Sequence, residues 1–221
     1  MSYTVIRKDL TEGTKKCFFC PNNLTSLKAY VLEDCDSGEH VFAGPWCAEK
    51  NVGKAALLAV PDLTKFTKSN KKKKSGELEA DTPTRESPER KAPEAVDHDE
   101  RRALEYLALR EDKLASELKC SYEVLTNYYD KSKKRSLTDK DIKHINNIEA
   151  KAPEKLSLSV LQRLYNYLFW IDVGIDKLPD DKREFLGIMR KRLLKAGKLT
   201  DGQKEATNKW LENIDGVPQL K

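Results

Sequence analysis

The sequence predicts a small α+β module at the N-terminus, followed by a mostly α-helical domain. Four of the five cysteines fall between Cys17 and Cys47, among short runs of strand-forming residues. After about residue 98, apolar residues recur every three to four positions, which is the period of an amphipathic helix. The intervening segment is charged and poor in apolar residues, which is typical of a linker. We therefore divide the chain into a module at 1–63, a flexible charged linker at 64–98 and a helical domain at 99–221.

A β-hairpin followed by a short helix is expected in the N-terminal module. Residues 29–34 and 40–45 are runs of strand-forming residues, and the sequence CDSGE between them favours a turn. A short helix should follow Cys47 and end at Pro61, because proline cannot continue a helix.

The linker combines two stretches of different charge. Lysines recur from Lys65 to Lys74 with no acid among them, and residues 77–100 hold nine acids and three prolines. Such a segment cannot bury enough apolar surface to offset its conformational entropy. We interpret it as a flexible tether, whose lysine-rich end is either solvated or in contact with phosphates.

About five helices are expected in the C-terminal domain. Apolar residues with helical spacing occupy 103–125, 142–148, 160–171, 185–194 and 210–214. The broadest apolar face, in 160–171, indicates a central helix. Helix starts at Thr138, Ser159 and Thr200 carry a capping-box pattern, in which a hydroxyl and the side chain three residues later each accept a backbone N–H.

Composition and cysteine usage limit the compartment of the protein. The 221-residue chain has a net charge of +5, and it contains no apolar run near the roughly 20 residues that span a bilayer. The N-terminus lacks the apolar stretch of a signal peptide. We therefore expect a cytoplasmic protein with no membrane partner. In that reducing compartment, clustered cysteines indicate a metal site rather than disulfides, and we interpret the isolated Cys120 as a small buried apolar residue.

Three cysteines have the spacing of a structural zinc site. Cys17 and Cys20 form a C-x2-C pair, in which a tight turn directs two thiolates at one ion. Cys47 follows the hairpin at the start of the expected helix, where the helix N-terminus favours the thiolate. A knuckle, a hairpin and a cysteine at a helix start form the plan of treble-clef and zinc-ribbon-like modules. Phe18 and Phe19, between the first two cysteines, either form an exposed aromatic tip or pack over the metal, and we expect them to pack over the metal.

The fourth ligand is left open between His40 and Cys35. Both residues lie near the turn of the expected hairpin. If residues 41–46 are extended, they span about 20 Å at roughly 3.3 Å per residue, which holds His40 away from Cys47 unless the hairpin bends back. We prefer His40 as the fourth ligand. The zinc should be structural rather than catalytic, because no HExxH or H-x-E pattern nearby supplies a base.

The cysteine-containing segment carries a longer pattern than the cysteines alone. It reads CFFCPNNL at 17–24, YVLED at 30–34, and then SGE and GPWCAEK at 44–50. This pattern resembles the small zinc modules of bacteriophage and mobile-element accessory proteins, which read roughly CxxCGxxL, a hairpin and GPxCAxK. The run LTDGQ at 199–203 is similar to an LTxxQ helix start that often accompanies them, and Pro21 stands where the family usually has glycine. The resemblance implies a DNA- or RNA-associated accessory factor that acts beside phage replication or transcription proteins, in the cytoplasm of a bacterial host.

Basic side chains gather at two places in the helical domain, and both are candidate nucleic-acid contacts. They are Lys131, Lys133, Lys134 and Arg135 between two helices, and Arg190, Lys191 and Arg192 on another helix. Such groups neutralise phosphates and release counterions, and Tyr122, Tyr128 and Tyr129 can stack on unpaired bases. A solvated helix face and core-packed tyrosines are the alternative interpretation. The modest sequence pI of about 8.8 favours non-specific or single-stranded binding, above all to single-stranded DNA.

Two non-enzymatic functions fit these patterns. The first is nucleic-acid binding in replication or transcription. The second is a protein–protein adaptor that links or inhibits host or phage machinery through two tethered modules. We predict no enzymatic activity, because His40, His98 and His144 have no readable acid or nucleophile partner and the chain has no phosphate-binding or nucleophile motif.

Overall fold

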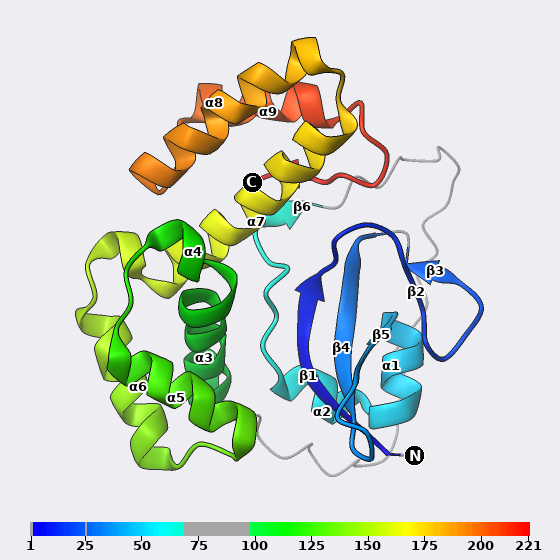
Figure 1. Ribbon diagram of the computed structural model, residues 1–221, viewed down its shortest axis with the longest axis vertical. Helices are drawn as coiled ribbons and strands as arrows, with labels where there is room; N and C mark the ends of the chain where they lie inside the picture. The colour runs from blue at the N-terminus through cyan, green and yellow to red at the C-terminus, as the bar shows by residue number, and fades with distance from the viewer. Residues whose placement is uncertain (1, 25, 69–97) are drawn as a thin grey trace, which may run out of the picture.

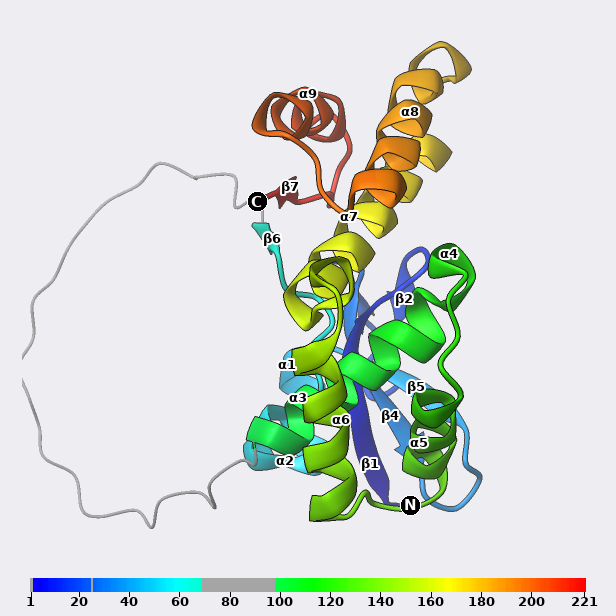
Figure 2. The same cartoon turned by 90° about the vertical axis from the view of Figure 1, so that its left-hand side faces the viewer.

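A small sheet region and a larger group of helices lie side by side in the computed structural model (Figure 1 and Figure 2). The structure describes residues 2–24, 26–68 and 98–221. It has an α+β region at the N-terminus followed by mostly helical structure, as the sequence predicts. Most of the expected linker, residues 69–97, lies outside the described residues.

The N-terminal region contains a three-stranded antiparallel sheet. The elements of this region are β1 (Tyr3–Leu10), β2 (Lys15–Lys16), β3 (Asn23–Leu24), β4 (Lys28–Asp34), β5 (His40–Ala43), α1 (Pro45–Val52), α2 (Lys54–Ala59) and β6 (Thr67–Lys68). β4 pairs with β1 on one side and with β5 on the other, and the β4–β5 hairpin confirms the expected one. Val5, Leu32 and Ala43 from the three strands pack with Cys47 and Ala48 of α1 in a small core.

The helix expected after Cys47 begins earlier and is divided. α1 starts at Pro45, whose fixed φ suits the first helical turn. Gly53 ends α1 with a φ of 83°, and α2 then runs to Ala59, shortly before Pro61. Because residues with a Cβ rarely adopt such a φ, the glycine at this position separates the two helices.

The helical region contains seven α-helices among the described residues. They are α3 (His98–Leu107), α4 (Ala115–Leu118), α5 (Glu123–Lys134), α6 (Asp139–Lys151), α7 (Leu158–Lys177), α8 (Asp180–Ala196) and α9 (Asp201–Leu211). A π-helix (Ala108–Lys113) joins α3 to α4, and β7 (Gln219–Leu220) follows α9. The expected number of about five was too low, because the periodic stretch 103–125 is interrupted. The π-helix and the left-handed Lys119, with a φ of 48°, separate α3, α4 and α5.

Two of the three expected capping boxes are confirmed. In Thr138–Asp141 and in Thr200–Gln203, both reciprocal hydrogen bonds of the box are present. The third prediction was wrong, because α7 begins at Leu158 and Ser159 therefore lies inside the helix. The side chain of Gln162 is buried among the helices instead of reaching back to the helix start.

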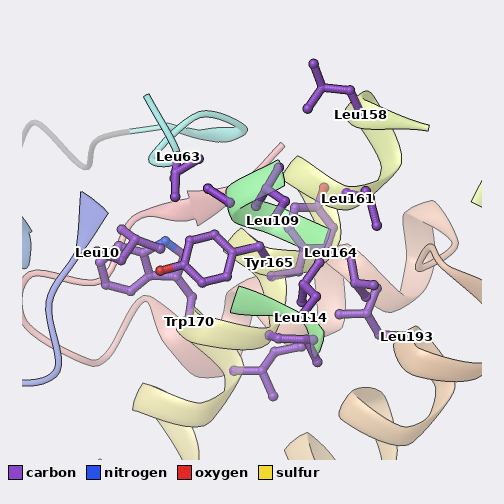
Figure 3. Close-up of a cluster of buried hydrophobic side chains, with 14 of the residues drawn as sticks. Leu10, Leu63, Leu109, Leu114, Leu158, Leu161, Leu164, Tyr165, Trp170 and Leu193 are labelled. Atoms are coloured by element: carbon purple, nitrogen blue, oxygen red, sulfur yellow. The ribbon is translucent and has the colours of Figure 1, made fainter. Parts of the chain in front are cut away.

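α7 is the central helix, as its broad apolar face predicts. Leu161 and Trp170 on this helix are fully buried, and Figure 3 shows them in a cluster with side chains from several other elements. Leu10 and Leu63, which belong to the N-terminal region, enter the same cluster. The helical core is therefore completed by residues that precede the expected linker.

A short segment, 61–63, carries the N-terminal region along the edge of β1 and into the helices. Lys8 exchanges backbone hydrogen bonds of 2.8 and 2.9 Å with Pro61 and Leu63. Farther along the chain, β6 pairs antiparallel with β7. Residues 64–68, which we expected at the start of the linker, are therefore part of the fold.

A buried carboxylate on β1 fastens the sheet to the helices. Asp9 is only 2% exposed, and it accepts hydrogen bonds from Arg7 Nε at 2.8 Å and from the Tyr165 hydroxyl at 2.7 Å. Lys113 Nζ forms an ion pair with the same carboxylate at 2.7 Å. Burial by itself would raise the pKa of Asp9, but Lys113 and Arg7 hold it below its ordinary value. β1, the π-helix and α7 therefore meet at one ionised group.

A second buried carboxylate, Glu105 on α3, binds the segment that leaves the sheet. Its oxygens accept hydrogen bonds from the Asp62 backbone amide at 3.1 Å and from Lys65 Nζ at 2.8 Å. Gln162 Nε2 donates to it from α7 at 2.6 Å. The two regions are thus joined by satisfied buried polar groups as well as by apolar packing.

We predict that Asp9→Asn lowers the free energy of unfolding by about 3–5 kcal/mol at neutral pH, because it removes the buried carboxylate that the half-buried Arg7 and Lys113 share. Urea unfolding measures the change. Because the pKa of Asp9 is lowered in the folded state, its contribution is complete above the ordinary aspartate pKa of about 3.9 and is lost as the pH falls below it. The difference between variant and wild type should therefore narrow in acid.

The exposed Asp36 provides the matched control for this substitution. Asp36→Asn should change the free energy of unfolding by less than about 0.5 kcal/mol. Equal stability of Asp9→Asn and Asp36→Asn at neutral pH would show that the Asp9 contacts do not fasten the sheet to the helices.

Candidate metal centre

The structure brings together the three cysteines whose spacing predicted a metal site. Cys17 and Cys20 lie in the turn between β2 and β3, and Cys47 lies in the first turn of α1. Their sulfur atoms are all within 4.8 Å of one another. Cys17 and Cys47 are buried, and Cys20 is half-buried. Three thiols this close can hold a metal ion.

Local hydrogen bonds shape the turn that carries the first two cysteines. The Cys17 amide donates to the Asn22 carbonyl at 2.9 Å, and the Phe18 amide donates to the Phe42 carbonyl of β5 at 2.9 Å. The knuckle is therefore closed on itself and fastened to the sheet. No residue from 17 to 22 has a positive φ, so the turn does not require glycine where Pro21 stands.

The thiols of Cys17 and Cys47 differ in acidity. Burial would raise the pKa of Cys17, but the backbone amides of Gly44 and Phe19 donate to its sulfur and bring the pKa below its ordinary value. Burial and the neighbouring thiols raise the pKa of Cys47 to about 11. Metal binding must displace these thiol protons, so it should strengthen as the pH rises.

Neither candidate for the fourth ligand joins the three thiols. His40 opens β5 opposite Glu33, and the extended strand carries it away from the start of α1. Cys35 is exposed, and its sulfur lies 3.3 Å from the Thr4 hydroxyl. His40 lines a hollow beside Cys17 and Cys20 but does not belong to the group of three thiols among the described residues, so its assignment as the fourth ligand stays a prediction.

The two predicted basic clusters are partly neutralised and lie far apart. Lys131 is ion-paired with Asp141, and Arg190 is held between Asp172 at 2.7 Å and Glu117 at 2.6 Å. These two cations are already ion-paired within the fold, and their assignment as phosphate contacts stays a prediction. Their helices, α5 and α8, lie at opposite ends of the long axis in Figure 1 and Figure 2, so the clusters do not form one surface.

Other members of the two basic clusters remain exposed. Lys134, Arg135, Lys191 and Arg192 are exposed and form no ion pair with any described residue. Lys133 is also exposed, with its Nζ 4.0 Å from the Tyr129 ring centroid and 3.9 Å from Asp130. Tyr128 bonds to His144 Nδ1 at 2.8 Å, whereas Tyr122 is 45% exposed.

Aromatic and basic side chains lie beside the cysteines. Trp46 is 73% exposed and Phe18 is 57% exposed, although we expected Phe18 to cover the metal. Lys50 Nζ lies 5.4 Å from the Trp46 ring centroid, and Lys15 Nζ lies 5.5 Å from that of Phe42. We call Lys15, Lys16, Phe18, Trp46 and Lys50 the Phe18–Trp46 surface.

Two hollows lie beside the cysteines, and each is lined by a different exposed aromatic side chain. Both are lined by Cys17 and Cys20. Phe18 and Lys16 line one hollow, and Trp46 lines the other, which has a volume of about 230 Å³. The position of Phe18 between the two knuckle cysteines marked it in the sequence as a residue near the metal site. The exposure of Trp46 could not be seen there, because it depends on which side of α1 faces the sheet.

We predict that the purified protein contains about one equivalent of metal, and that Cys17→Ser or Cys47→Ser removes most of it. Elemental analysis by mass spectrometry gives the metal content. Cys35→Ser and His40→Ala should retain the wild-type content, because neither side chain belongs to the group. Loss of metal from His40→Ala would restore His40 as a ligand.

Among the described residues, no helix is both long and apolar enough to cross a membrane. Comparison with known proteins shows that no family model, no curated protein and no solved structure matches this chain.

Proposed function

We propose that this chain is a non-catalytic, zinc-containing accessory protein that binds single-stranded nucleic acid, above all single-stranded DNA, at the Phe18–Trp46 surface. Zinc is the metal we assign to the three thiols, because it favours tetrahedral thiolate sites and has no redox chemistry that would oxidise them. Its role is to hold the knuckle against α1, and so to hold the aromatic side chains in place.

The observation that carries the proposal is that two exposed aromatic side chains lie beside lysines: Lys50 lies over the Trp46 ring, and Lys16 lines a hollow with Phe18. A single-stranded nucleic acid binds by stacking bases on aromatic side chains while its phosphates follow a basic groove. Trp46 and Phe18 offer ring faces, and both are more than half exposed. A buried location would be expected if these large apolar side chains served only the core.

The lysines of the surface supply the charge that phosphates require. Lys15, Lys16 and Lys50 form no ion pair with any described residue. Lys50 already lies over the Trp46 ring, so a phosphate bound there would sit next to a base stacked on that ring. The positive charge is thus available beside the stacking platform.

The resemblance of the cysteine segment to phage zinc modules supports an accessory role beside replication or transcription proteins in a bacterial cytoplasm. The basic end of α5, with Lys133, Lys134 and Arg135, is a second candidate contact. α5 and α1 lie on opposite sides of the sheet in Figure 1, so one short strand is not expected to reach both.

A second candidate function is the protein–protein adaptor. Trp46 favours it, because an exposed tryptophan is a common energetic centre of protein interfaces. The adaptor would present this one surface, since the docked sheet and helices do not behave as two independent tethered modules. Single-stranded DNA binding at low salt separates the two functions.

We predict that Trp46→Ala weakens the binding of a labelled short oligothymidine by roughly 5- to 150-fold, because one stacked base contributes about 1–3 kcal/mol. Phe18→Ala should act in the same direction. Fluorescence anisotropy at low salt measures the affinity. Ile188→Ala, which removes an exposed apolar side chain from α8, is the matched control and should bind normally. If wild-type binding is undetectable at low salt, the proposed nucleic-acid function is wrong, and the protein–protein adaptor becomes the better-supported function.

The salt dependence of binding should identify the phosphate contacts. For single strands, each lost contact flattens the slope of log K against log salt by about 0.7, so Lys15→Glu with Lys50→Glu should flatten it by about 1.4. Lys191→Glu with Arg192→Glu makes the same charge change on α8 and should leave the slope unchanged. An effect confined to Lys134→Glu with Arg135→Glu would move the site to α5.

A further inference from the structure

The three-thiol group lacks a fourth donor from the rest of the chain's thiols and imidazoles. All five cysteines and all three histidines of the chain are among the described residues. Cys35, Cys120, His40, His98 and His144 lie outside the group, and no described acid belongs to it. A zinc ion in a closed structural site takes four ligands. His40 lines the other hollow, beside Cys17 and Cys20, but not the hollow that all three cysteines line, so the tetrahedral position on that side is left to a donor from outside these residues.

A hollow leads to the thiols from the solvent. Its volume is about 230 Å³, and beside the three cysteines it is lined by Asn22, Leu24, Gly44 and Trp46. A water molecule occupies about 30 Å³ of liquid, so this space admits a five-membered ring as well as a water. Trp46, at 73% exposure, keeps one wall of the hollow at the molecular surface.

Charge decides which donor suits the position. A zinc ion with three thiolates already carries a net charge of about −1, and a fourth thiolate or a carboxylate would make it about −2. No cation lines the hollow, whose walls include Leu24, Gly44 and Trp46. A neutral imidazole adds no charge and is a preferred zinc ligand.

The walls of the hollow also suit an imidazole ring. The indole of Trp46 offers a flat face for stacking against it. Asn22 contributes the one side-chain carbonyl among the lining residues, and it can accept a hydrogen bond from the ring N–H that does not face the metal. Metal-bound histidines usually donate that N–H to an acceptor, which fixes the ring orientation.

We propose that the fourth coordination position is an exchangeable site that takes the imidazole of a histidine on a partner protein, with water bound there in its absence. The inference rests on the proposed zinc centre and goes beyond nucleic-acid binding, because it assigns a protein partner to the same face. The partner's histidine would enter beside Trp46 and complete the tetrahedral site.

Cobalt substitution of the full chain tests the proposal with imidazole as the probe. Cobalt(II) reports its ligands through visible d–d bands and thiolate charge-transfer bands. We expect imidazole to shift the d–d bands saturably while the thiolate bands persist. Asn22→Ala should weaken imidazole by roughly 2- to 12-fold, the effect of one hydrogen bond, without lowering the metal content. It should not weaken 1-methylimidazole, which has no N–H to donate.

The outcomes distinguish a failure of the metal centre from a failure of the exchangeable position. No cobalt spectrum at all would overturn the metal centre itself. A tetrahedral spectrum that does not respond to imidazole would show a closed site and overturn the exchangeable position alone. Loss of the thiolate bands on adding imidazole would mean that the metal is extracted, which also overturns the proposal. Cys35→Ser and His40→Ala should match the wild type, since neither lies in the group.

Discussion

The ionised carboxylate of Asp9 is the contact on which the arrangement of sheet and helices depends. It lies at the end of β1 and meets Lys113 of the π-helix and Tyr165 of α7 in a buried setting. A buried charge is tolerated only when all its partners are in place, so this group selects one orientation of the two regions. That orientation leaves the β2–β3 knuckle on the far side of the sheet from the helices, as Figure 1 shows. The group of three cysteines is consequently presented outward.

Features set by neighbouring residues were predictable, and features set by distant ones were not. The β4–β5 hairpin, the two threonine capping boxes and the meeting of three cysteines each follow from a spacing of a few residues or one hairpin. The Asp9–Tyr165 hydrogen bond joins residues 156 positions apart, and no local pattern announces it. The start of the linker was predicted too early for the same reason. Residues 64–68 are polar, but distant residues, Glu105 and β7, hold them in the fold.

In the candidate site, too, features that depend on distant residues could not be predicted from the sequence. The charge pattern of α8 suggested a phosphate contact at Arg190, but its partners Asp172 and Glu117 come from two other helices. The fourth ligand was sought near the hairpin turn, but His40, at the start of β5, lies outside the group of three thiols. Trp46 was read only as part of a motif. Its exposure follows from its neighbour Cys47, since the helix turns that side chain inward and Trp46 outward.

The docked arrangement has a consequence for how the protein is made. Cys17 to Cys47 form a local group, so the metal module can close soon after its residues leave the ribosome. Leu10, Leu27 and Leu63 belong to the helical core and stay uncovered until α7 has been synthesised. Non-local contacts form late, and apolar surface left open in the meantime invites aggregation. A nascent chain of this protein is therefore expected to pass through a stage in which a folded N-terminal module carries one unprotected apolar edge, and a chaperone would be most useful at that stage.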